Sequence, residues 1–282
     1  MDTDNQKSEL IRKKIRKDFF AGMEPGSRLH RHERDFLDIS SDCFNEIGDG
    51  VTHPSKVLLE LKKRLWSAVE KDKDICVMQR MYIYYATSLY HAIAAFLAYE
   101  ALMCYISSTS KRIQTHIVAH VGNCSSRVVM ASEMLCQIDF VLNSDSGKYR
   151  SILLKMKDKG KTPPLNNYET KFFDLIFSEF GNDFGQGKGK LHLRDKVVHR
   201  AFPYVINRRR SAPTGWFLIK PDICDDQLTE LRDRVDKSKN GWDSDFVVQS
   251  LFKVGEDSIH IEQLCRKLCL AYLKTLRSLS GI

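Results

Sequence analysis

The feature that most constrains the fold of this 282-residue chain is a stretch of nineteen residues, 81–99, without any Asp, Glu, Lys or Arg. Such a stretch is near the length that a helix needs to cross a membrane. It is also rich in Tyr and Ala and carries Thr87, Ser88 and His91. We therefore expect a long buried helix, which must be wrapped by other helices or shared with a second subunit because it is apolar nearly all round. The alternative is a membrane-associated helical protein built on this stretch.

Apolar periodicity predicts further helices around this one. Ser55 can cap a helix that runs to about Glu70, and the apolar run itself indicates a helix over about 74–106. Residues 215–220 form the one convincing strand pattern. Together, these predicted helices and the single short strand indicate an all-α fold, a bundle of long helices with short irregular insertions. The remaining helices are expected at about 111–142, 167–180, from Arg194 to Pro203, at 225–237, and at 243–279 with a break near Gly255.

The first 54 residues are expected to form an N-terminal arm, and residues 55–282 a single helical domain. In the arm, a charged amphipathic stretch at 9–20 precedes a Gly/Pro turn and a loop-like region that runs to about Pro54. Residues 30–34 of this region, HRHER, form a mixed charge cluster that we expect to be a solvated face. No composition shift or internal repeat divides the remainder of the chain.

Composition narrows the classes of function. The chain has 44 Lys plus Arg against 36 Asp plus Glu, and this net charge of +8 favours polyanionic partners. Its eight cysteines show no CxxC spacing and no apolar signal core is seen near Met1, so we expect reduced thiols and a cytoplasmic protein. The motifs GxGxxG, GxxxxGK[ST], GxSxG and HExxH do not occur. We expect no cofactor and no metal, since His116 and His120 lack an evident third ligand.

The hexapeptide RDKVVH at 194–199 is the strongest functional signal. Arg194 presents a planar fork of donors that matches two phosphate oxygens, and His199 titrates near neutrality and can act as base or acid. Asp195 and His199 are four residues apart and share a helix face, so the carboxylate can orient the imidazole. Residues five apart, however, point roughly 140° away from each other on a straight helix. Arg194 must therefore lie in an unwound helix start, bend back, or meet a histidine from a second subunit.

This segment resembles the motif of the HEPN superfamily of all-α domains: an Arg, a polar residue, three further residues and a His. The resemblance implies a metal-independent endoribonuclease that cleaves single-stranded RNA as a homodimer, in toxin-like or antiviral RNA destruction. It implies catalytic roles for Arg194 and His199, a supporting role for Asp195, and an inhibitor or antitoxin protein as a further partner. Some family toxins carry a modified Tyr two positions after the His; here that position is Ala201, which puts this mode of regulation in doubt.

Basic residues around the hexapeptide are expected to hold the phosphates of flanking nucleotides. A solvated cationic surface explains them equally well, with Asp195 as a helix cap. The corresponding alternative function is a non-catalytic HEPN-like module that binds RNA, nucleotide or a protein partner, and no membrane partner is expected. The expected RNA-binding residues are Lys188, Lys190, Lys196, Arg200, Arg208, Arg209 and Arg210.

Overall fold

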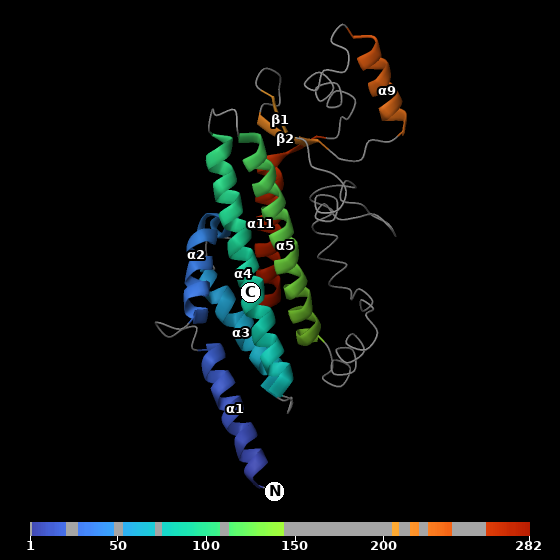
Figure 1. Cartoon of the computed structure of the whole chain (residues 1–282). Helices are drawn as coiled ribbons and strands as arrows, with labels where there is room; N and C mark the ends of the chain where they lie inside the picture. Colours follow the sequence, from blue (N-terminus) through green and yellow to red (C-terminus); the bar gives the residue numbers. More distant parts are fainter. Residues whose placement is uncertain are drawn as a thin grey trace. The chain divides into compact units, whose positions relative to one another are not determined.

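Helices dominate the computed structural model of the chain (Figure 1). This confirms the prediction of an all-α protein, while the HEPN-like arrangement stays a prediction. The structure describes residues 2–20, 28–47, 53–70, 75–107, 113–143, 205–208, 215–219, 225–238 and 258–282. The helices are α1 (Asp2–Phe20), α2 (Arg28–Ile47), α3 (Pro54–Glu70), α4 (Ile75–Ile106), α5 (Ile113–Asn143), α9 (Asp225–Asp236) and α11 (Ile261–Ser280); the strands are β1 (Val205–Arg208), β2 (Gly215–Ile219) and β3 (Ser258–His260).

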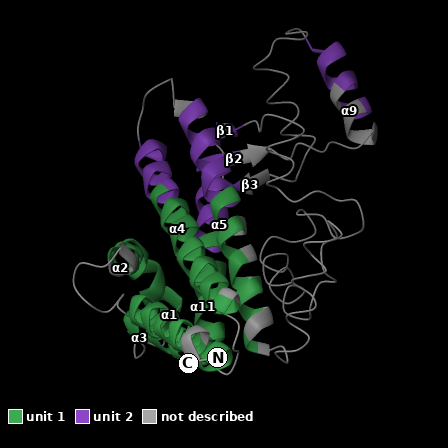
Figure 2. Cartoon of the chain, turned by 60° about the horizontal axis from the view of Figure 1, so that its bottom comes forward, with its two compact units in different colours: residues 1–97, 126–181, 268–282 green, residues 98–125, 182–267 purple. Residues whose placement is uncertain are grey.

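The described part divides into two compact units, which Figure 2 distinguishes by colour. Unit 1 comprises residues 1–97, 126–181 and 268–282, and unit 2 comprises residues 98–125 and 182–267. The division runs through α4, α5 and α11, so each of these helices contributes residues to both units. The predicted division of the chain after residue 54 is a separate matter and stays a prediction.

Helix α2 corrects the expectation of a loop before Pro54. Phe36, Ser40 and Phe44 recur every four residues and are all buried, as the inner face of an amphipathic helix requires. The charge cluster at 30–34 is likewise not wholly solvated, because Glu33 lies on this inner face and is buried. Both α1 and α2 contact α3, so the predicted arm contains two packed helices.

Helix α3 begins two residues earlier than predicted, because His53 rather than Ser55 caps it. The backbone N–H of Ser55 donates to Nδ1 of His53 at 3.3 Å, and the N–H of Lys56 donates to the His53 carbonyl oxygen at 2.9 Å. Pro54 occupies the first helical position, where its fixed φ is favourable and its missing N–H costs nothing.

Helix α4 is buried on one side only. Tyr85, Leu89 and Phe96 are at most 1% exposed, whereas Ile83, Tyr90 and Leu97 are 55%, 52% and 52% exposed. The segment Val77–Ile106 is long and apolar enough to cross a membrane, and 33% of its most apolar window is buried. Among the described residues, neighbouring helices cover only one side of α4, so the alternative that other helices wrap it is wrong there. The alternative that α4 is shared with a second subunit stays a prediction, and so does the cytoplasmic location.

Hydrogen bonds inside unit 1 join α4, α5 and α11. The hydroxyl group of Ser88 donates to the carbonyl oxygen of Ala131 at 2.9 Å. The hydroxyl group of Tyr272 lies 2.9 Å from the same serine oxygen. Because the Ser88 hydrogen is used toward Ala131, the Tyr272 hydroxyl must be the donor to Ser88. Phe36 and Phe96 complete this centre, with the Phe36 ring edge-on to both Phe96 and Tyr272 at 6.1 Å.

Unit 2 contains a three-stranded antiparallel sheet in the order β1-β2-β3. Strand β2 matches the predicted strand, while β1 and β3 are too short to show an alternating pattern in the sequence. Gly215 begins β2 with φ of +126°, and a Cβ there would come within 2.5 Å of Nε2 of His260. Glycine is therefore required where β2 passes beside the His260 ring.

Candidate functional site

The residues predicted to form the nuclease site lie almost entirely outside the part of the chain that the structure describes. Arg208 is the exception, as the last residue of β1, where it is paired with Gly215 of β2. The structure therefore leaves the predicted constellation as a proposal from sequence. Outside the described residues lie Arg194, Asp195, His199, Lys188, Lys190, Lys196, Arg200, Arg209 and Arg210.

His116 and His120, which were considered as metal ligands from the sequence, stack on the ring of Tyr105 within unit 2. The ring of Tyr105 is parallel to that of His116, with centroids 4.7 Å apart, and lies 5.2 Å from the ring of His120 at 21°. Burial, and then the neighbouring His116, lower the pKa of His120, which favours its neutral form. Within the described ranges, no three His, Cys, Asp or Glu residues gather as a metal site would require.

Cys124 and Cys265 form a pair of thiols in the core of unit 2. Both side chains are fully buried, and a hydrogen bond joins them. This hydrogen bond and burial raise the pKa of Cys265 well above its ordinary value. Both effects oppose thiolate formation, so Cys265 is an inert core residue rather than a nucleophile.

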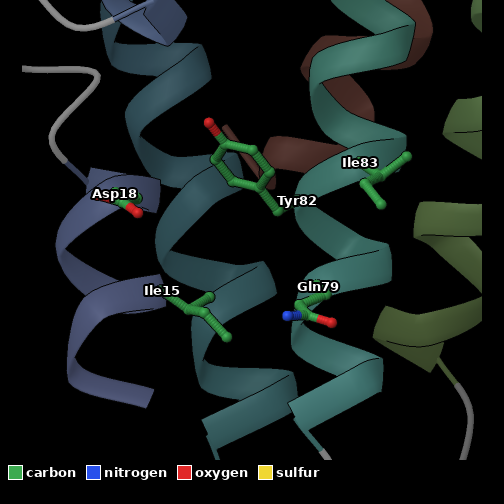
Figure 3. Close-up of a pocket in the computed structure, with 5 residues that line it drawn as sticks. All are labelled: Ile15, Asp18, Gln79, Tyr82 and Ile83. Carbon is green, nitrogen blue, oxygen red and sulfur yellow. The ribbon is translucent and has the colours of Figure 1, made fainter. Parts of the chain in front are cut away.

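A groove of about 300 Å³ lies between α1 and α4 in unit 1. Figure 3 shows Ile15 and Asp18 of α1 facing Gln79 and Tyr82 of α4. Burial, and then the carboxylates of Asp18 and Glu33, raise the pKa of Tyr82, so its hydroxyl group is a protonated donor at neutral pH. The described lining residues offer hydrogen bonds, apolar contact and one carboxylate, Asp18, but no His, Cys, Ser or Lys to act with it, so the groove is better suited to binding than to catalysis.

A buried ionic cluster in unit 1 was missed by reasoning from sequence. Nζ of Lys62 on α3 pairs with Oε1 of Glu33 on α2, and the hydroxyl group of Tyr85 on α4 donates to the same oxygen at 2.7 Å. The Lys62 ammonium also lies 5.6 Å from the centroid of the Tyr85 ring. One sequence signal exists: Lys62 falls on the inner face of α3, beside the buried Leu58, Leu61 and Leu65.

This cluster is structural rather than catalytic. Burial lowers the pKa of Lys62, and the Glu33 carboxylate offsets part of that effect. Burial raises the pKa of Tyr85 well above its ordinary value, and the charge of Glu33 adds to it. A lysine with a lowered pKa is the kind of residue that forms Schiff bases. Lys62, however, has only 1% of its side chain exposed and is already paired, so no substrate reaches it.

Comparison with models of protein families, with curated proteins and with solved structures finds no match to this chain.

Proposed function

We propose that the protein is a metal-independent endoribonuclease of the HEPN type that cleaves single-stranded RNA. The observation that carries this proposal is the hexapeptide at 194–199, which has Arg, a polar residue and His at every position that the motif specifies. The helical character of the described residues agrees with an all-α domain of this kind. The net charge of +8 suits a polyanionic substrate. The proposed setting is a cytoplasmic homodimer with a toxin-like or antiviral role, controlled by an inhibitor or antitoxin protein.

RNA supplies its own nucleophile, so the proposed reaction needs no metal. The 2′-oxygen attacks phosphorus, a new bond forms between them, and the bond from phosphorus to the 5′-oxygen breaks. Arg194 binds the non-bridging oxygens and stabilises the charge that develops on them. His199 either takes the proton of the 2′-hydroxyl group or gives a proton to the leaving 5′-oxygen, and water takes or supplies the other proton. Asp195 accepts the ring N–H of His199 and fixes its tautomer. The products are a 2′,3′-cyclic phosphate and a 5′-hydroxyl end.

The flanking basic residues have a separate role in this proposal. They bind phosphates on either side of the scissile bond and so set the register of the strand without reading its bases. Lys196 and Arg200 belong to the same segment as the hexapeptide. The others are Lys188, Lys190, Arg208, Arg209 and Arg210.

A second candidate is a non-catalytic helical module that binds RNA, nucleotide or a protein partner. The groove between α1 and α4 favours it, because the five described residues that line this groove provide polar and apolar binding groups, with Asp18 as the one carboxylate and no nucleophile beside it. This candidate predicts binding without turnover.

The experiment that separates the two candidates compares Arg194→Ala and His199→Ala proteins with the wild type. Labelled single-stranded RNA is incubated with each protein in excess EDTA, and the cleaved fraction is followed with time. His199→Ala is expected to lower the rate about 10²- to 10⁴-fold, the usual contribution of one acid or base. Arg194→Ala is expected to lower it about 10²- to 10³-fold, the usual contribution of one donor to a developing negative charge. Arg34→Ala, which changes an exposed arginine on α2, is the control and should cleave like the wild type. Undiminished cleavage by both variants would contradict the proposal.

A further inference from the structure

The six basic residues of α1 separate into two sides of the helix. Arg16 faces the body of unit 1, with its guanidinium 5.6 Å from the centroid of the Trp66 ring and 3.7 Å from a carboxylate oxygen of Glu70. Arg12 is half-buried on the same side. Phe19 is buried there as well, in ring contact with Trp66 at 6.3 Å. The arginines thus lie on the side of α1 that packs against unit 1.

The lysines of α1 lie on the opposite side and are all exposed. At about 100° per residue, Lys7, Lys13, Lys14 and Lys17 fall with Leu10 in one sector that covers roughly a third of the helix circumference. We call these four lysines and Leu10 the lysine face. Glu9 lies at the edge of the face and pairs with Lys13 at 3.8 Å, a contact of little strength because both side chains are at least 70% exposed.

Three of these lysines form no ion pair within the described ranges, although Asp18 lies one helical turn after Lys14. In the described part of the chain, Lys7, Lys14 and Lys17 form no ion pair and no hydrogen bond through their ammonium groups. Ten residues separate Lys7 from Lys17, which places them about 15 Å apart along the helix axis. The phosphates of one strand of a duplex follow each other at about 3.4 Å along its axis, so the lysine face spans several successive phosphates.

The lysine face could bind either an anionic membrane or the sugar–phosphate backbone of a nucleic acid. The distribution of apolar side chains on α1 distinguishes these two partners. A helix that binds an anionic membrane buries a broad apolar face beside its basic one. In α1 the inward residue Phe19 is 4% exposed and Ile15 is half-buried, so these side chains already pack within unit 1. Leu10, 72% exposed, is the one large apolar residue on the lysine face, and Ile11 lies beyond its edge. This surface is therefore electrostatic, which suits a sugar–phosphate backbone.

We propose that the lysine face of α1 binds the phosphate backbone of an RNA strand without reading its sequence. This inference rests on the proposed function for the choice of RNA, and it adds a contact surface remote in sequence from residues 188–210.

The test measures binding of a labelled 2′-O-methyl oligouridine 20-mer, which lacks the nucleophilic hydroxyl group and so stays intact. Fluorescence anisotropy gives its affinity for the full chain between 50 and 300 mM KCl. The test variant is Lys7→Gln, Lys14→Gln, Lys17→Gln. The control variant removes the same charge from exposed lysines elsewhere, as Lys56→Gln, Lys237→Gln, Lys274→Gln.

The test variant should bind at least about tenfold more weakly at 50 mM KCl, and its slope of log affinity against log salt should be shallower by about 2, since each single-strand phosphate contact contributes about 0.7. The control should keep the slope of the wild type. Equal slopes for test and control would overturn the inference, even if the wild type cleaves RNA. A loss specific to the test variant would support it, even if no cleavage is found.

A second experiment tests an anionic membrane as the alternative partner. It measures how much of the protein sediments with vesicles of phosphatidylglycerol and phosphatidylcholine. No dependence of vesicle binding on Lys7, Lys14 and Lys17 is expected. Vesicle binding that needs these lysines, together with RNA binding that does not, would overturn the choice of partner.

Discussion

The ammonium group of Lys62 and the carboxylate of Glu33 form an ion pair inside unit 1, where their side chains are only 1% and 10% exposed. The pair joins α3 to α2, and the hydroxyl group of Tyr85 adds α4 to the same carboxylate oxygen. Lys62, Glu33 and Tyr85 therefore connect α3, α2 and α4 through polar contacts within a core that is mostly apolar. A buried pair of this kind is sensitive to the loss of either partner, because the remaining charge has no access to water.

Removing one partner of this pair should destabilise the protein strongly. We expect Lys62→Met or Glu33→Gln to lower the free energy of unfolding by about 3–5 kcal/mol. The double variant Lys62→Met, Glu33→Gln, which keeps an acceptor for the Tyr85 hydroxyl group, should cost less than either. Urea unfolding followed by circular dichroism measures these values. Lys63→Met is a matched control, since Lys63 lies next in the sequence and its pair with Glu60 is exposed. A cost for Lys62→Met no larger than that for Lys63→Met would contradict this account.

The Tyr272 hydroxyl group donates to Ser88, and Ser88 donates to Ala131. This direction predicts that Ser88→Ala destabilises the protein more than Tyr272→Phe does. Tyr272→Phe removes a donor and should cost about 0.5–1.5 kcal/mol in the free energy of unfolding. Ser88→Ala leaves the buried Tyr272 hydroxyl group without an acceptor and should cost about 1–3 kcal/mol. Chemical denaturation of both variants and of the double variant checks the order. If Tyr272→Phe proved the more costly, the assigned direction of the bond would be wrong.

His91 gives the stability of unit 1 a dependence on pH. Nη1 of Arg127 lies 3.0 Å from Nδ1 of His91 and donates to it, so the imidazole must be neutral. Burial, and then the charge of Arg127, lower the pKa of His91 in the folded protein. The unfolded chain binds its proton near pH 6.5, before the folded chain does, so stability is lost as the pH falls through that value.

This loss should be smaller in His91→Gln, whose amide oxygen accepts from Arg127 without titrating. The measurement is the free energy of unfolding between pH 8 and pH 5 for both proteins. The pKa of His120 is lowered as well, so His120→Gln should change the profile in the same direction. Identical pH profiles for the wild type and His91→Gln would rule out this contribution.

The fold was largely predictable where apolar residues recur at helical spacing over a long segment. Helices α3, α4 and α9 lie close to their predicted bounds because each has an extended periodic pattern. Helix α2 was missed because its many charged residues and its adjacent serines masked the helical spacing of Phe36, Ser40 and Phe44. Strands β1 and β3 are three or four residues long, and such short segments are stabilised by pairing with β2 rather than by their own sequences.

Sites that depend on residues distant in sequence were beyond prediction. The hexapeptide at 194–199 is found readily because its residues are adjacent. The Lys62–Glu33 pair and the groove beside Tyr82 each combine different helices, so their spacing in the sequence carries no signal. The cluster at 30–34 shows the same limit: charge indicates a solvated face, and only the packing of α2 on α3 places Glu33 inside.

The chemistry of the cleaved ends tests the proposed nuclease most directly. The protein is incubated in EDTA with a single-stranded RNA 20-mer and with the same sequence methylated at every 2′-oxygen, and the products are identified by mass spectrometry. We predict 2′,3′-cyclic phosphate and 5′-hydroxyl ends from the unmodified strand, no cleavage of the methylated strand, and loss of these products in Arg194→Ala and His199→Ala. Cleavage of the methylated strand, or 5′-phosphate ends, would contradict attack by the 2′-hydroxyl group.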